Sequence, residues 1–125
     1  MSTNNIIDLS IIAKLKQFEF FPKKVYDGIR LPSSYLVRIN GVPLDPRSDL
    51  KKTSNGFTWG EDTLESRQLA FAILVDLFGS DKEELIQSCF EIVMHDIICE
   101  LSQSNWILTD ASILSILVKG LGIKV

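Results

Sequence analysis

The ten residues from Leu69 to Phe78 form the most apolar segment of this 125-residue chain, and no other feature constrains its fold as strongly. Nine of the ten are apolar, and only Asp76 is charged. A helix that is apolar on nearly all sides must be buried on nearly all sides. We therefore expect a helix from about Thr63 to Phe78 at the centre of the fold, with the other elements packed around it.

Both ends of this predicted helix carry recognisable signals. Asp62 is followed three residues later by Glu65, which is typical of a capping box. In that arrangement Asp62 accepts the backbone N–H of Glu65, and Glu65 reaches back toward the cap. Gly79 follows the apolar run and is expected to end the helix in the left-handed conformation.

Two further helices are predicted after Gly79. Residues Ser80–Glu83 repeat the capping pattern, and apolar residues then recur on one face from Leu85 to Leu101. This second helix and the central one should form a helical hairpin joined at the glycine. Either Thr109 or Asp110 then caps a last helix that runs through residue 118.

The segment before the central helix favours β-structure. Val25–Leu31 and Tyr35–Leu44 are rich in β-branched and aromatic residues and predict two strands of a hairpin. Asn40-Gly41 is a strong turn signal and could fold Val42–Leu44 back as a third short strand. Trp106–Leu108 is interpreted as a short apolar link that could be extended.

These elements predict one α+β domain over residues 1–125. A small antiparallel sheet of two or three strands should pack against the helical hairpin and the C-terminal helix. Spacings of three and four between apolar residues predict an additional helix over Asn5–Gln17, so that residues 1–22 form a helical extension and 23–125 the core. An aromatic cluster follows that helix and either plugs the core or docks a partner such as a second copy of the chain. Its members are Phe18, Phe20 and Phe21.

Composition excludes several classes of protein. No apolar run reaches the roughly 18 residues that a membrane span needs, and the first residues do not resemble a signal peptide. A net charge of −3 with only loose groups of basic residues gives little reason to expect nucleic-acid binding. Cys89 and Cys99 lie about 15 Å apart along one predicted helix, too far for a disulfide. They indicate reduced cysteines in a cytoplasmic protein.

No catalytic motif is present, and we expect a protein that is not an enzyme and has no cofactor or metal. His95 is the only histidine. Glu91, His95 and Cys99 recur at intervals of four on one predicted helix, but no second cluster of ligands completes a tetrahedral metal site. Nothing obvious would orient His95 for a nucleophilic pair with Cys99 either.

The turn before the central helix is the candidate binding site. Its carboxylates, Glu61, Asp62 and Glu65, either cap the helix and complement its dipole or carry out acid–base or cation chemistry in a hydrolase. Trp59 and Arg67 are residue types that often dominate binding energy. Trp59 could equally be part of the core. The neighbouring loop from Arg47 to Lys52 would extend the site, since loops on a rigid scaffold commonly carry binding.

At this same turn the chain resembles an uncharacterised family of small bacterial and phage proteins with the signature Phe-x-Trp-Gly, a glycine-rich turn, then Gln-Leu-Ala-x-Ala-Ile-Leu. The residues matching it without a gap are Phe57, Trp59, Gly60, Gln68, Leu69, Ala70, Ala72, Ile73 and Leu74. Tyr26–Arg30 is similar to the family's Tyr-x-Gly-x-Arg strand, and Trp106–Thr109 to its closing tryptophan element. The likeness covers about residues 25 to 118 and implies a fold and a phage or mobile-element context, without a catalytic residue.

The departure from that signature bears on function. Residues Glu61–Arg67 replace the glycine-rich turn, and acids there should repel an anion that backbone N–H groups would otherwise attract. Our leading hypothesis is a small cytoplasmic protein that binds a protein partner through Trp59, Glu61, Asp62, Glu65 and Arg67. The alternative is a small-ligand or nucleotide-binding protein that uses the same turn, with Arg30 and Arg67 as anion partners.

Overall fold

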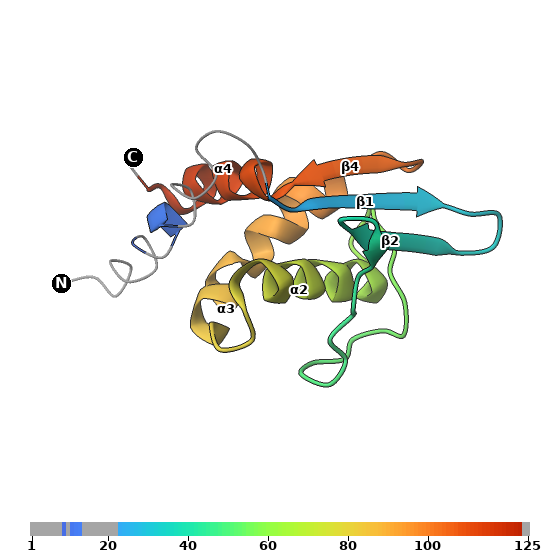
Figure 1. Ribbon diagram of the computed structural model, residues 1–125, viewed down its shortest axis with the longest axis horizontal. Coiled ribbons are helices and arrows are strands. Elements are labelled where there is room, and N and C mark those ends of the chain that lie inside the picture. The colour runs from blue at the N-terminus through green and yellow to red at the C-terminus, as the bar shows by residue number, and fades with distance from the viewer. Residues whose placement is uncertain (1–8, 10, 14–22, 124–125) are drawn as a thin grey trace.

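The computed structural model describes residues 9, 11–13 and 23–123, and these form an α+β fold (Figure 1). A four-stranded antiparallel sheet has the strand order β3-β2-β1-β4. The strands are β1 (Val25–Arg30), β2 (Tyr35–Ile39), β3 (Val42–Pro43) and β4 (Trp106–Thr109). The helices are α2 (Leu64–Phe78), α3 (Glu83–Ile92), the π-helical η1 (Val93–Ile97), the 3-10 turn η2 (Ile98–Glu100) and α4 (Asp110–Leu121).

The sheet has one strand more than the two or three predicted. The hairpin of β1 and β2 and the short β3 after Asn40-Gly41 are confirmed. The additional strand is β4, the segment interpreted as an apolar link, and it pairs with β1 in the register Tyr26↔Leu108 and Gly28↔Trp106. Four residues are too few for alternation to identify a strand, and the partner of β4 lies about 80 residues away in sequence.

One face of the sheet forms part of the core. Tyr26, Gly28, Val37 and Trp106 are buried on this face, whereas the residues that alternate with them are half-buried or exposed. Gly28 is required here because a Cβ at this position would collide with the indole ring of Trp106. The glycine therefore lets the indole ring of Trp106 lie against the backbone of β1.

Helix α2 is the centre of the fold, as its apolar sequence predicts. Ten of its fifteen residues are buried, and it contacts α3, η1 and η2. Its cap differs from the prediction by one residue. Thr63 is the N-cap, and its Oγ1 accepts the backbone N–H of Ser66 at 3.1 Å, which frees Asp62 for another partner. Gly79 ends the helix at a φ of 100°, but its ψ of 152° lies outside the left-handed helical region.

The second predicted helix is divided into three parts. Regular α-helix ends at Ile92, a π-helical turn follows as η1, and η2 closes the segment. The predicted capping box at its start is also wrong, because the N-cap is Lys82 and no side chain bonds to the free N–H groups there. The last helix does begin as expected, with Thr109 Oγ1 accepting the N–H of Ser112 at 3.1 Å.

Two carboxylates tie the sheet to the helices. Asp110 is fully buried and accepts the backbone N–H of Lys24 at 2.9 Å, so it joins the start of β1 to the start of α4. Asp76, the only charged residue in the apolar run of α2, accepts the hydroxyl of Tyr26 at 2.7 Å and lies 3.2 Å from the ammonium of Lys24. The interruption of the apolar run thus anchors the central helix to β1.

Tyr26 makes the free energy of unfolding depend on pH in the alkaline range. Burial, followed by the hydrogen bond to Asp76 and its negative charge, raises the pKa of Tyr26 far above its usual value of about 10. Above that pH the unfolded chain loses the phenolic proton while the folded chain keeps it. The contribution of Tyr26 to the free energy of unfolding is therefore fully present below pH 10. It declines as the pH rises above that value, at a rate approaching about 1.4 kcal/mol per pH unit. Urea unfolding at pH 8 to 11 measures this slope.

The matched variant is Tyr26→Phe, which removes the titrating group but keeps the ring. We expect the variant to lose less stability than the wild type between pH 9.5 and 11. Comparing the two proteins cancels the titration of lysines and of Cys89, whose pKa burial raises to about 12. Parallel pH profiles for both proteins would contradict the assignment to Tyr26.

Little of the predicted N-terminal extension can be compared with the structure. Residues 9 and 11–13 are helical, and Ile11 is part of the hydrophobic core. The remainder of the helix predicted over Asn5–Gln17 lies outside the described residues, as do Phe18, Phe20 and Phe21. Within the part of the chain that the structure describes, no helix has the length and apolar character needed to cross a membrane.

Candidate functional site

Trp59, the first residue of the predicted site, is buried. Only 1% of its surface is exposed. Its ring packs edge-on between Tyr35, at 4.9 Å between centroids, and Trp106, at 5.5 Å. Its indole N–H donates to the backbone carbonyl of Ser104 at 3.2 Å. Trp59 therefore joins the sheet to the segment before β4 and is inaccessible to a partner in this fold.

The charged residues of the turn remain at the surface. Glu61 and Glu65 are exposed. Arg67 forms a two-pronged ion pair with Asp62, both hydrogen bonds measuring 2.9 Å, and a second pair with Glu91 of α3 at 3.2 Å. The turn and the two helices are thus connected at this point by one guanidinium between two carboxylates.

The pKa values follow from this geometry. The hydrogen bonds that the guanidinium of Arg67 donates to Asp62 and then to Glu91 raise the pKa of Arg67 above its usual range. In return, the hydrogen bond from Arg67 lowers the pKa of Asp62. The charge of Arg67 is neutralised by two neighbours, which leaves it poorly suited to bind an additional anion.

Glu91, His95 and Cys99 lie near this network. His95 Nε2 is 2.9 Å from the carboxylate of Glu91, so the predicted proximity of these two is observed. Partial burial, then the negative charges of Asp62 and Glu100, raise the pKa of Cys99, which disfavours the thiolate that nucleophilic chemistry needs. Among the described residues, no group of three His, Cys, Asp or Glu side chains could hold a metal ion.

Arg30, the second anion partner of the nucleotide alternative, also has protein contacts. Its guanidinium donates to the carbonyl of Gln103 at 3.2 Å and lies 5.7 Å from the ring centroid of Tyr35. Its backbone N–H donates to the side chain of Asn105 at 2.9 Å. These contacts connect the end of β1 to the segment before β4, so Arg30 has a structural role.

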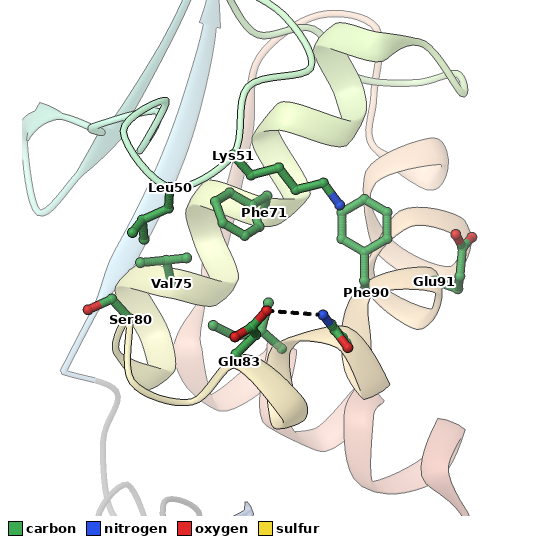
Figure 2. A pocket seen from close by; sticks show the side chains of 10 residues that line it. Leu50, Lys51, Phe71, Val75, Ser80, Glu83, Phe90 and Glu91 are labelled. Atoms are coloured by element: carbon green, nitrogen blue, oxygen red, sulfur yellow. Dashed lines mark hydrogen bonds between the residues drawn. The ribbon is translucent and has the colours of Figure 1, made fainter.

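The structure places an open pocket beside the predicted turn, on the outer side of the helical hairpin. We name it the α2–α3 groove; it has a volume of about 460 Å³ and lies between the loop after β3 and the helices α2 and α3 (Figure 2). Its lining residues are Leu50, Lys51, Phe71, Val75, Ser80, Glu83, Ile86, Gln87, Phe90 and Glu91.

The groove has an apolar floor and charged edges. Phe71 and Phe90 are half-buried, and Leu50 is 48% exposed. Lys51 extends over the ring of Phe90, with its ammonium 5.6 Å from the centroid, and the guanidinium of Arg67 lies 5.7 Å from the same ring. Cations within about 6 Å of an aromatic ring are attracted to its face. Arg67 thus connects the predicted turn to the wall of the groove.

A single buried side chain, Gln68, positions the loop that forms one wall. Its amide nitrogen donates to the carbonyls of Pro46, at 2.6 Å, and Lys51, at 2.9 Å. Its amide oxygen accepts the backbone N–H of Thr53 at 2.6 Å and of Ser54 at 3.3 Å, as well as the Thr53 hydroxyl at 3.1 Å. These bonds use the full capacity of the amide, so Gln68 fixes the loop against α2.

Only part of the α2–α3 groove was expected from the sequence. The Arg47–Lys52 loop was expected to contribute, and Leu50 and Lys51 do line the groove. The residues from α2 and α3 were missed, because a half-exposed Phe71 or Phe90 cannot be distinguished from a core residue in an apolar sequence. Gln68, a polar residue at the start of the most apolar run, is the signal that could have revealed how the loop is held against α2.

Comparison with known proteins agrees with the resemblance in part. A family described as a family of unknown function (DUF6166) matches residues 26–119. No curated protein and no solved structure matches the chain. The glycine-rich signature and the bacterial or phage origin stay predictions.

Proposed function

We propose that this chain, which belongs to the DUF6166 family of unknown function, is a non-enzymatic module that binds a protein partner through the α2–α3 groove. The observation that supports it is an open apolar groove with aromatic rings on its floor, held in shape by Gln68. Apolar anchors seated in such pockets usually dominate the energy of protein binding. Two free cysteines, Cys89 and Cys99, agree with a reducing compartment such as the cytoplasm.

The dimensions of the groove suit one or two side chains of a partner. Its volume of about 460 Å³ falls within the range of about 300–1,000 Å³ that is typical of ligand pockets. Phe71 offers an apolar ring against which an aliphatic or aromatic side chain can pack, and Phe90, whose ring Lys51 and Arg67 approach, adds apolar area beside it. A segment of a partner can therefore insert an anchor while its backbone stays outside.

The charges around the groove indicate what flanks that anchor. Lys51 stands on one wall, and Glu83 and Glu91 stand on the other side. Glu91 is already paired with Arg67, whereas the one hydrogen bond of Glu83 within the described residues is a long one from Gln87, at 3.4 Å. We therefore expect a basic group of the partner near Glu83 and an acceptor near Lys51.

The same charges disfavour the nucleotide alternative. Two of the three charged residues that line the groove are carboxylates, which repel a phosphate. Arg67 is neutralised by Asp62 and Glu91. A polypeptide that carries both kinds of charge complements this pattern better than an anionic ligand does.

A peptide-display selection tests the proposal. A random library is panned against the wild-type chain and depleted on the Phe71→Asp variant, and binding of the recovered peptides is measured by fluorescence polarisation. We expect an apolar anchor with a neighbouring lysine or arginine. Glu83→Arg should weaken the recovered peptides by about tenfold or more, since each factor of ten corresponds to about 1.4 kcal/mol.

Matched controls separate the groove from general effects of charge. Leu64→Asp makes the same kind of change at an exposed position of α2 outside the groove, and Glu84→Arg reverses the exposed charge next to Glu83. Both controls should retain binding. A selection that recovers no peptide after depletion, or peptides that bind Glu83→Arg as tightly as the wild type, would contradict the proposal. A nucleotide that raises the melting temperature of the wild type, but not of an Arg67→Ala variant, would favour the alternative instead.

A further inference from the structure

The two edges of the sheet differ in how they are protected against pairing with another chain. One edge is β3, which has two residues and contains Pro43. Short strands and proline are common devices that prevent edge pairing. The other edge is β4, which has four residues without a charge, a proline or a glycine. Its central Ile107 is 75% exposed, more than any other large apolar residue among those described.

The hydrogen-bonding groups of β4 alternate between β1 and the open side. The backbone N–H of Asp110 donates to the carbonyl of Lys24 at 3.0 Å, which makes these two residues a hydrogen-bonded pair. In an antiparallel ladder, hydrogen-bonded and non-bonded pairs alternate, so Trp106 and Leu108 also bond to β1. Ile107 therefore directs both its N–H and its C=O away from the sheet, and Thr109 its N–H, toward a side where the described part of the chain provides no further strand (Figure 1). The C=O of Thr109, as the N-cap of α4, belongs to the first turn of that helix.

We infer that β4 is a self-association edge, through which two copies of this chain join their sheets by antiparallel β4–β4 pairing. Opposite residues of an antiparallel pair point to the same face. A twofold arrangement centred on Ile107 lets this residue exchange both backbone hydrogen bonds with Ile107 of the second copy. Thr109 of each copy then lies opposite Asn105 of the other. The partner is a second copy of the chain, and the contact is isologous.

The charge pattern of the strand favours a second copy over another protein. At a twofold axis each residue meets itself or a near neighbour, so a charged strand would repel its own copy. Residues 105–109, Asn-Trp-Ile-Leu-Thr, carry no charge. On the outer face the nearest charges, Asp27 and Arg38, pair with each other within one copy. The pairing also covers Ile107, the most exposed apolar side chain.

Sedimentation of the full chain over roughly 1 μM to 1 mM tests this inference. We expect a reversible monomer–dimer equilibrium. Ile107→Lys places two ammonium groups opposite each other, and Ile107→Pro removes the outward N–H without touching a bond to β1. Each variant should weaken dimerisation by about tenfold or more. The control is Val42→Lys on the protected edge, which is 59% exposed and should dimerise like the wild type.

Disulfide trapping tests the register. Opposed residues of a hydrogen-bonded pair have Cα atoms about 5.5 Å apart, within the range of about 4.4–6.8 Å that a disulfide needs. In a Cys99→Ser background, Ile107→Cys should therefore cross-link rapidly with copper phenanthroline, and Val42→Cys should not. A chain that stays monomeric at the highest concentration would overturn the inference, as would equal dimerisation of all variants, with circular dichroism showing that each is folded.

Discussion

Replacing Trp59 by alanine is expected to lower the free energy of unfolding by about 3–5 kcal/mol, the usual cost of removing a large buried aromatic side chain. The variant loses both edge-on ring contacts, to Tyr35 and Trp106, and the hydrogen bond to the carbonyl of Ser104. Small domains have only about 5–15 kcal/mol of stability in total. Urea unfolding followed by far-ultraviolet circular dichroism measures the loss, and we expect a large shift of the midpoint to lower urea.

Two further variants show whether the loss of stability comes from removing the buried ring. Trp59→Phe keeps an aromatic ring in the site and should lose clearly less stability than the alanine variant. Leu64→Ala removes an apolar side chain that is 61% exposed, and it should change stability by no more than about 0.5 kcal/mol. If Trp59→Ala unfolded at the same urea concentration as the wild type, the burial described for this residue would be wrong, and Trp59 would again be available to a partner.

Replacing Gln68 by leucine is expected to lower the free energy of unfolding by about 2–4 kcal/mol. The amide forms five hydrogen bonds with the loop, and buried donors and acceptors that lose their partner destabilise the folded chain. Leucine has a similar volume but leaves the carbonyls of Pro46 and Lys51 without a donor. The loop should then separate from α2. Hydrogen exchange of the Thr53 and Ser54 amides should accelerate more than exchange in the core of α2.

The control for this variant is Gln87→Leu. Gln87 is exposed, and its side chain makes only the long hydrogen bond to Glu83, so the same substitution should be nearly neutral for stability. Since Leu50 and Lys51 belong to the loop that Gln68 holds, Gln68→Leu should also weaken peptides that bind the α2–α3 groove. Unchanged exchange of the Thr53 amide would show that the loop is held by other contacts.

Both predictions concern residues of the signature proposed from the sequence, and both assign them a structural role. Trp59 packs between Tyr35 and Trp106, and Gln68 holds the loop after β3 against α2. Gly60 adopts a φ of 88° and donates its N–H to the carbonyl of Ile98 at 2.9 Å. These residues therefore preserve a scaffold. The acidic residues of the turn, Glu61 and Glu65, lie at the surface of this scaffold and take no part in those contacts.

The elements that the sequence predicted well are those defined by local patterns. The buried helix α2 follows from its apolar run, the hairpin of β1 and β2 from β-rich segments around a turn, and the start of α4 from Thr109. Each depends on residues close together in the chain. The predicted N-cap of α2 was wrong by one residue because Asp62 and Thr63 are both good N-cap residues. In the folded chain Asp62 pairs with Arg67 instead, and Thr63 caps the helix.

Which of the candidate residues are exposed was harder to predict, for a physical reason. Residue types such as Trp59 are frequent both in binding sites and in cores, and exposure alone separates the two roles. The groove is built from a loop and two helices that approach one another only in the folded chain. A sequence pattern shows which residues are apolar, but not which of them remain uncovered when all elements have packed.

The sequence by itself thus determined an α+β fold organised around a buried helix, because hydrophobic periodicity and turn chemistry act between near neighbours. Only the tertiary structure decided that β4 completes the sheet, that Asp76 and Gln68 anchor α2 to β1 and to the loop, and that an open groove lies beside Arg67. These features depend on contacts between residues from about 14 to about 80 positions apart, whose geometry is set by the packing of the whole chain.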